Sequence, residues 1–221
     1  MHTRLKVCCI ASIEEARLAV RLGADALGLV GAMPSGPGPI DDALIAEIAR
    51  SVPPGVATFL LTSRIIPDHI VEHVLAARVN TVQLVDAVPD AAYTLLRRHA
   101  PAVRIVQVLH VQDDGVLDEA TRLAPHVDAL LLDSGRPTAP LKELGGTGRT
   151  HDWSISARLV AAAARPVFLA GGITPANVGE AIRSVRPFGI DLCIGVRTAG
   201  RLDETKLRAL VAAMHAAGAW A

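Results

Sequence analysis

Two side chains that end apolar runs are the first candidates for chemistry. Cys8 lies near the end of the run LKVCCI, and Asp133 follows the run DALLL directly. A carboxylate at the end of a buried run must be solvated, paired or functional. A free cysteine often serves as a small buried hydrophobe, so its residue type alone favours packing. The sequence therefore singles out Asp133, whereas for Cys8 the residue type and position alone favour packing over function.

Glycines after later apolar runs offer a place for an anion. Gly171 and Gly172 follow one such run, and Thr174 and Pro175 then open a predicted helix. Backbone N–H groups at a helix N-terminus bind phosphate, although a Gly-Gly pair also serves any tight turn. Gly195 follows the last apolar run in the same way.

A second group of glycines, which includes Gly146 and Gly148, lies in the long connection between residues 133 and 153. Connections of this length are usually binding loops or lids, and the glycines are equally compatible with a flexible hinge. We therefore predict that this connection lies over the site.

Eight apolar runs, each followed by a stretch with helical spacing, must position these residues. The runs are rich in Val, Ile, Leu and Ala without alternation, which is typical of parallel strands buried on both faces. The predicted strands are 5–10, 26–30, 56–61, 81–85, 103–109, 128–132, 166–170 and 190–194, and the predicted helices are 12–22, 41–51, 67–77, 89–99, 113–124, 154–164, 175–185 and 203–217.

Eight strand-helix units in 221 residues predict a single α/β domain over residues 1–221, a closed (β/α)8 TIM barrel. A doubly wound open sheet is the alternative. In a barrel, active groups lie at the carboxyl ends of the strands, where Cys8, Asp133 and the glycines fall.

Composition narrows the class of partner. The chain carries 22 basic and 22 acidic residues, is 51% hydrophobic and only 3% aromatic. This balance favours a small-molecule substrate and gives no sign of nucleic-acid or membrane binding. Three cysteines without a zinc-type spacing, and an N-terminus without a signal-peptide pattern, predict a cytoplasmic protein with no metal. Monomer and homodimer both remain open.

Taken together, the motifs resemble those of the phosphoribosylanthranilate isomerase family of tryptophan biosynthesis, over nearly the whole chain. The matching segments are Leu5-Lys-Val-Cys-Cys9, Gly23-Ala-Asp-Ala-Leu-Gly28, Thr81-Val-Gln-Leu84, Leu130-Leu-Leu-Asp-Ser134, Gly145-Gly-Thr-Gly148, Asp152-Trp153, Leu169-Ala-Gly-Gly-Ile-Thr-Pro175, Asn177-Val178 and Gly189-Ile-Asp191.

The resemblance implies an Amadori rearrangement of a phosphoribosylated amine without a cofactor. Cys8 would be the general base at the sugar C2 and Asp133 the general acid at the ring oxygen, with the glycines and Arg197 at the phosphate and substrate. A cysteine base needs an electropositive setting, and Lys6 lies two residues earlier on the same strand face. Lys6 is equally suited to pair with a core carboxylate such as Asp25 or Asp191.

The sequence departs from the family where the aryl carboxylate would bind. The family's Ser-Pro-Arg is replaced by Pro34-Ser-Gly-Pro-Gly-Pro39, and no arginine occurs between Arg21 and Arg50. Arg197 is a possible substitute from the last strand. Cys9 replaces the family's glycine after the catalytic cysteine, and His151 its aromatic before Asp152.

The loss of the arginine predicts a diverged member of the family, acting either in tryptophan biosynthesis or on a different sugar phosphate in specialised metabolism. A non-catalytic barrel that binds a phosphometabolite is the alternative from another class.

Overall fold

The computed structural model describes residues 3–136, 139, 142–144, 148 and 150–218. Strand and helix alternate along the chain, and two short strands and one 3-10 helix precede the last helix. The elements are β1 (Arg4–Val7), α1 (Ile13–Arg21), β2 (Ala26–Val30), α2 (Asp42–Ser51), β3 (Ala57–Thr62), α3 (Pro67–Ala77), β4 (Thr81–Leu84), α4 (Asp90–His99), β5 (Arg104–His110), α5 (Gly115–Leu123), β6 (Ala129–Asp133), α6 (Trp153–Ala162), β7 (Val167–Leu169), α7 (Val178–Val185), β8 (Gly189–Leu192), η1 (Ile194–Val196), β9 (Arg197–Thr198), β10 (Arg201–Leu202) and α8 (Glu204–Ala216).

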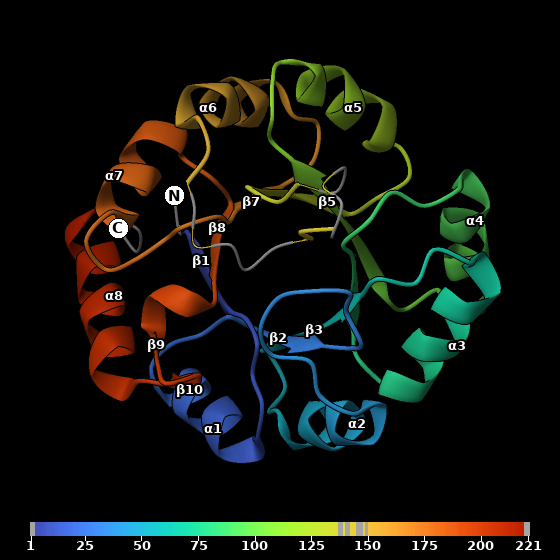
Figure 1. Ribbon diagram of the computed structural model, residues 1–221, viewed down its shortest axis with the longest axis horizontal. Helices are drawn as coiled ribbons and strands as arrows, with labels where there is room; N and C mark the ends of the chain where they lie inside the picture. The colour runs from blue at the N-terminus through green and yellow to red at the C-terminus, as the bar shows by residue number, and fades with distance from the viewer. Residues whose placement is uncertain (1–2, 137–138, 140–141, 145–147, 149, 219–221) are drawn as a thin grey trace.

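Strands β1 to β8 form a closed barrel in sequence order, and every neighbouring pair is parallel. The closure lies between β1 and β8, where Lys6 pairs with Asp191 and Val7 with Leu192. Figure 1 looks along the barrel and shows the helices as an outer ring. The predicted (β/α)8 barrel is confirmed, and the doubly wound alternative is wrong because the first and last strands pair.

The two faces of each strand belong to two separate cores. On β6, Leu130 and Leu132 pack outward into the cluster shared with the helices, whereas Leu131 belongs to a smaller cluster inside the barrel. Successive side chains of a strand point to opposite faces, so every strand serves both cores. This double burial explains why the runs read as continuously apolar.

Inside such a barrel, inward side chains from alternate strands stack in tiers. The register pairs Leu61 with Gln83 and Gln83 with Val106, and it continues around the closed sheet. It thereby brings the inward positions of the even strands to one level, which we call the floor tier: Gly28, Gln83, Leu131 and Asp191. Cys8 lies just above this tier, and Asp133 lies one step higher.

The predicted strands and helices are all present, mostly with boundaries shifted by one or more residues, and two of the differences bear on the site. Helix α7 begins at Val178 rather than at residue 175, because Asn177 binds back to the preceding loop through its side chain. Strand β8 ends at Leu192, and the chain then turns into η1 and the β9–β10 hairpin, which periodicity does not predict. At α1, the side chain of Ser12 accepts the N–H of Glu15 at 3.2 Å, as a capping residue does.

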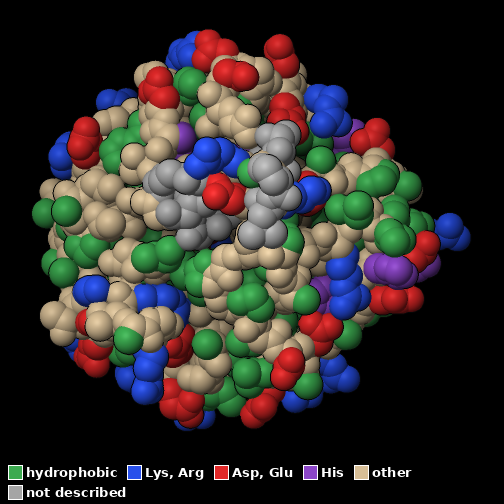
Figure 2. All heavy atoms as spheres, viewed as in Figure 1, with side chains coloured by type: hydrophobic (Ala, Val, Ile, Leu, Met, Phe, Trp, Pro, Cys, Tyr) green, Lys and Arg blue, Asp and Glu red, His purple; other side chains and the backbone are tan. Residues whose placement is uncertain are grey.

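The described surface carries both signs of charge. Figure 2 shows basic and acidic side chains dispersed around the face that Figure 1 views, with no broad patch of one sign. Among the described residues, no helix is both long and apolar enough to cross a membrane.

Candidate active site

A cavity of about 170 Å³ opens at the carboxyl ends of the barrel strands. It is lined by six of the eight predicted site residues that the sequence singled out: Cys8, Asp133, Gly148, Gly171, Gly172 and Gly195. Gly146 lies outside the described residues, and Arg197 does not line the cavity. The closed sheet therefore brings residues from both ends of the chain to one place.

Cys8 follows β1 and is 5% exposed. Its backbone N–H donates to the carbonyl of Leu192 at 2.8 Å, which extends the β1–β8 pairing to the cysteine. A Cβ atom on Gly28 would lie 2.7 Å from the Cys8 Sγ and 3.2 Å from the Lys6 Nζ. Both side chains thus occupy the space that this glycine leaves open.

Lys6 and Asp191 form an ion pair inside the barrel. The Lys6 Nζ lies 2.8 Å from Asp191 Oδ1, with side chains 0% and 8% exposed. Burial lowers the pKa of Lys6, but the charge and hydrogen bond of Asp191, with the nearby Cys8 and Cys9 thiols, raise it overall. Lys6 therefore stays cationic and places positive charge beside Cys8. Of the two core carboxylates considered from the sequence, Asp25 instead accepts from Arg4 and from a backbone N–H.

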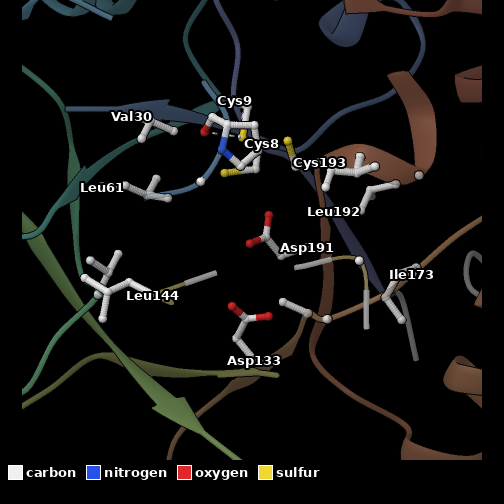
Figure 3. Close-up of a pocket in the computed structure, with 18 of the residues that line it drawn as sticks. Cys8, Cys9, Val30, Leu61, Asp133, Leu144, Ile173, Asp191, Leu192 and Cys193 are labelled. Carbon is white, nitrogen blue, oxygen red and sulfur yellow. Dashed lines mark hydrogen bonds between the residues drawn. The ribbon is translucent and has the colours of Figure 1, made fainter. Parts of the chain in front are cut away.

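Asp133 ends β6 and is 7% exposed. Burial raises its pKa to about 6, with a further rise from the charge of Asp191, against a backbone hydrogen bond from Ser134 and the charge of Lys6. A carboxyl group with this pKa is protonated in a useful fraction of molecules near neutral pH, so it is able to donate a proton. Figure 3 shows its carboxyl group pointing into the cavity, across from the cysteines, with Asp191 between them.

Glycines at the β7–β8 side allow two loops to approach each other closely at the cavity. Gly171 and Gly172 have φ values of +83° and +63°, and a Cβ on Gly171 would lie 2.9 Å from the Ser134 Oγ. A Cβ on Gly195 would lie 2.1 Å from the carbonyl oxygen of Ile173, so only glycine permits the two loops to touch. Together they form a wall made mostly of main chain.

Arg197 has a different place from the one predicted. It is 8% exposed, and its guanidinium group bonds to Glu15 Oε2 at 3.1 Å. It also donates to the carbonyl oxygens of Cys8 at 3.2 Å and of Cys9. The structure thus makes Arg197 a brace that holds the end of β1, and from behind the cavity wall its charge also acts on the Cys193 thiol.

Two cavity residues were not singled out as site residues from the sequence. Asp191 was considered only as a core carboxylate, and Gln83 only as part of a motif, yet both line the cavity. Their inward orientation follows from strand alternation, since Ile190 and Val82, beside them in sequence, belong to the outer core. The signal was present, but it could be used only once the register was known.

The cavity wall formed by residues 33–37 contains no cation. Ser35, Gly36 and Pro37 line the cavity, and the Ser35 Oγ donates to the carbonyl of Lys142 at 2.5 Å. No lysine or arginine is among the described lining residues, and the described chain holds no cluster of metal-ligating side chains. A substrate carboxylate would find no charged partner in this part of the site.

Comparison with known proteins settles the family. The model of a family described as N-(5'-phosphoribosyl)anthranilate (PRA) isomerase matches residues 5–213. The chain belongs to the PRA isomerase family. The match covers all eight strands of the barrel, so it includes every cavity wall. The protein is therefore an isomerase of the aldose-ketose type.

Individual PRA isomerases agree over nearly the full length. The chain is 39% identical over 208 residues to N-(5'-phosphoribosyl)anthranilate isomerase 2 of Methanosarcina mazei, covering 92% of this chain and 90% of the relative. It is 38% identical over 217 residues to the isomerase of Haloferax volcanii, covering 97% and 94%.

Solved PRA isomerases share the fold. The enzyme of Thermus thermophilus superposes with a TM-score of 0.82 at 30% identity, over 97% of this chain and 99% of that one. A second PRA isomerase, solved in complex with reduced 1-(o-carboxyphenylamino)-1-deoxyribulose 5-phosphate, superposes with a TM-score of 0.78 at 26% identity, over 97% and 99%.

Cys9 stands where the PRA isomerase resemblance implies glycine, and its backbone keeps a glycine-like shape. Its φ is +61°, a left-handed conformation that costs a residue with a Cβ about 1–2 kcal/mol. Its thiol lies 3.6 Å from the carbonyl oxygen of Pro37. Both Cys9 and Cys193 line the cavity.

The cysteines interact with one another. The hydrogen bond that the Cys9 thiol donates to Cys193 is the largest cause that raises the pKa of Cys9. The hydrogen bond with Cys8 and burial raise it further. The Cys193 sulfur accepts the hydrogen bond from Cys9, which lowers the pKa of Cys193, and the positive charge of Arg197 lowers it further. The sulfur atoms gather on one side of the cavity (Figure 3), which gives this member of the family a cavity wall rich in thiols.

Proposed function

We propose that the protein catalyses the Amadori rearrangement of phosphoribosylanthranilate, with Asp133 as general acid and Cys8 as general base. Asp133 gives its proton to the ring oxygen, and the ring opens to a Schiff base. Cys8 then removes the proton from C2, which yields an enolamine that tautomerises to the 1-deoxyribulose product. The sugar phosphate lies against the main chain of Gly171, Gly172 and Gly195.

The observation that carries this proposal is the entry of a thiol from β1 and a carboxyl from β6 into one cavity from opposite sides. Two proton transfers at different atoms of one substrate require two groups that stand apart. The elevated pKa of Asp133, about 6, supports the acid role. The Lys6 ammonium beside Cys8 supports the base role, since cysteine bases work in electropositive surroundings.

Turnover of phosphoribosylanthranilate by purified variants tests the proposal. Cys8→Ser and Asp133→Asn should each lower kcat/KM by roughly a hundredfold or more, the usual contribution of a general acid or base. Asp128→Asn is the matched control, since that carboxylate caps the opposite end of the same strand and pairs with Arg97 and Arg104. Full activity in both site variants would refute the assigned mechanism.

A different aryl group is the second candidate, favoured by the uncharged wall at residues 33–37. Loss of a charge-assisted contact removes about 1.5–3 kcal/mol of binding to a carboxylate. Comparing kcat/KM for phosphoribosylanthranilate with that for phosphoribosylaniline separates the two. A strong preference for the anthranilate supports the tryptophan pathway, whereas equal rates or the reverse order support specialised metabolism.

The same proposal covers the compartment. The cavity contains free thiols at Cys8, Cys9 and Cys193, which persist in a reducing cytoplasm. We therefore place the enzyme in the cytoplasm.

A further inference from the structure

Two buried glutamines on neighbouring strands have opposite surroundings. Gln107 on β5 is 2% exposed and Gln83 on β4 is 3% exposed. At this depth bulk water does not supply the hydrogen bonds that their side-chain amides need. The two side chains point to opposite faces of the sheet, because alternate residues of a strand do so. Gln107 points to the outer core, as Ile105 and Leu109 do. Gln83 points inside the barrel and lines the cavity.

The amide of Gln107 is fully used. Its Oε1 accepts from the hydroxyl of Tyr93 at 2.9 Å, and its Nε2 lies 3.0–3.2 Å from the carbonyl oxygens of Leu84, Asp86 and Val108. Such an amide is a structural element that ties α4 and the end of β4 to β5.

The amide oxygen of Gln83 differs from that of Gln107. Among the described residues, no donor reaches its Oε1, although the atom is buried. A buried acceptor without a partner destabilises the folded state, and apolar residues fill most other inward positions of this barrel. An acceptor that is kept at this cost and faces a cavity points to a ligand that supplies the missing hydrogen.

The depth of Gln83 identifies the part of the ligand it meets. Gln83 belongs to the floor tier, whose other polar member, Asp191, already binds Lys6 through Oδ1. Cys8 lies just above this tier. In the proposed function, on which this inference rests, C2 of the sugar lies at the level of Cys8, so its hydroxyl group reaches the floor.

We propose that Gln83 is a substrate-binding residue whose amide oxygen accepts a hydrogen bond from the C2 hydroxyl group of a ribose 5-phosphate unit. With this hydroxyl held at the floor, the hydrogen on the same carbon is turned toward Cys8. The contact selects sugars that carry a hydroxyl group at C2 and orients the carbon that is deprotonated.

Ligand binding to two sugar phosphates tests the contact without turnover. The affinities of ribose 5-phosphate and 2-deoxyribose 5-phosphate, measured by calorimetry, should differ about tenfold in the wild-type protein. In Gln83→Leu the ratio should fall close to one, because the acceptor is gone. In Gln107→Leu, used as the matched control at a temperature where it is folded, the ratio should remain.

Stability separates a ligand contact from a structural one. Gln107→Leu leaves the Tyr93 hydroxyl and nearby carbonyl oxygens without their partner, and its Tm should fall by about 5 °C or more. Gln83→Leu removes an acceptor that no donor in the described part of the chain satisfies, so its Tm should stay or rise. At the same time its kcat/KM for phosphoribosylanthranilate should fall about tenfold to a hundredfold.

Two results would overturn the inference alone: an unchanged preference for ribose 5-phosphate in Gln83→Leu, or equal binding of both sugars by a wild-type protein that turns over phosphoribosylanthranilate. A wild-type protein that binds neither sugar phosphate and shows no turnover would overturn the proposed function as well.

Discussion

The outer face of the barrel strands carries almost only apolar side chains, whereas the inner face also carries buried polar and charged ones. On the outer face, Leu130 and Leu132 of β6 meet only the aliphatic core beneath the helices. On the inner face of the same strand, Asp133 faces the cavity as a buried carboxyl group. The outer face stabilises the fold, whereas the inner face holds polar groups that weaken it and make chemistry possible. Four sets of substitutions test this division.

The largest effect is expected at the interior ion pair. Asp191→Asn leaves the Lys6 ammonium without a countercharge at a site that is 0% exposed, and should cost about 3–5 kcal/mol in urea unfolding. The double variant Lys6→Met with Asp191→Asn removes the stranded charge and should regain most of the loss. A single variant as stable as the wild type would contradict the inner-face interpretation.

A somewhat smaller loss is expected on the outer face. Leu132→Ala opens a void in a fully buried position and should cost about 2–5 kcal/mol. Its kcat, measured well below the midpoint of unfolding, should match the wild type because Leu132 points away from the cavity. A fall in kcat in the folded variant would show that the two faces are not separate.

Asp133 should couple activity to stability through pH. The pKa of Asp133 is about 6 in the folded protein, above the value of 3.8 in the unfolded chain. Asp133 therefore costs no stability below about pH 4, and the free energy of unfolding falls as the pH rises through 6. The cost above this range is about 3 kcal/mol. Asp133→Asn should therefore become more stable than the wild type above pH 6 by roughly this amount, while it loses activity. Urea midpoints of both proteins at a series of pH values measure the difference, and parallel curves would exclude it.

The smallest effects are expected for two glycines. Gly28→Ala would bring a Cβ to 2.7 Å from the Cys8 Sγ, and the displaced base should lower kcat/KM about a hundredfold. The nearest atom to a Cβ from Gly179→Ala in α7 is the flexible end of the Arg183 side chain, at 3.2 Å, and the change should raise stability by about 0.5 kcal/mol. Turnover and thermal melts of both variants provide the check. Equal activity of Gly28→Ala and Gly179→Ala would show that the space beside Cys8 is not needed.

Sequence patterns predicted what depends on local order. The eight apolar runs and their helices established the barrel, and the rule that sites lie at carboxyl ends then placed Cys8, Asp133 and the Gly171–Gly172 pair at one rim. These predictions succeed because strand order equals chain order in this fold.

The sequence could not predict contacts between residues that are far apart in the chain, nor which face of a strand a residue occupies. Arg197 meets Glu15, 182 residues away, and nothing near Arg197 in sequence signals this contact. Gln83 and Gln107 are the same residue type in similar apolar runs, and only the register of the closed sheet separates them. Because both faces of each strand are buried, the hydropathy pattern does not distinguish the inner face from the outer one.

The missing side chain of Gly28 bears on how such a barrel gains room for a reaction. Its tier contains three side chains instead of four, and the sulfur of Cys8 and the nitrogen of Lys6 lean into the vacancy. The space that the absent side chain leaves is taken by the two polar groups themselves, so the glycine lets a thiol and an ammonium come together in a tightly packed interior. The placement of this pair can thus be adjusted at one codon, without any change to the surrounding wall of helices.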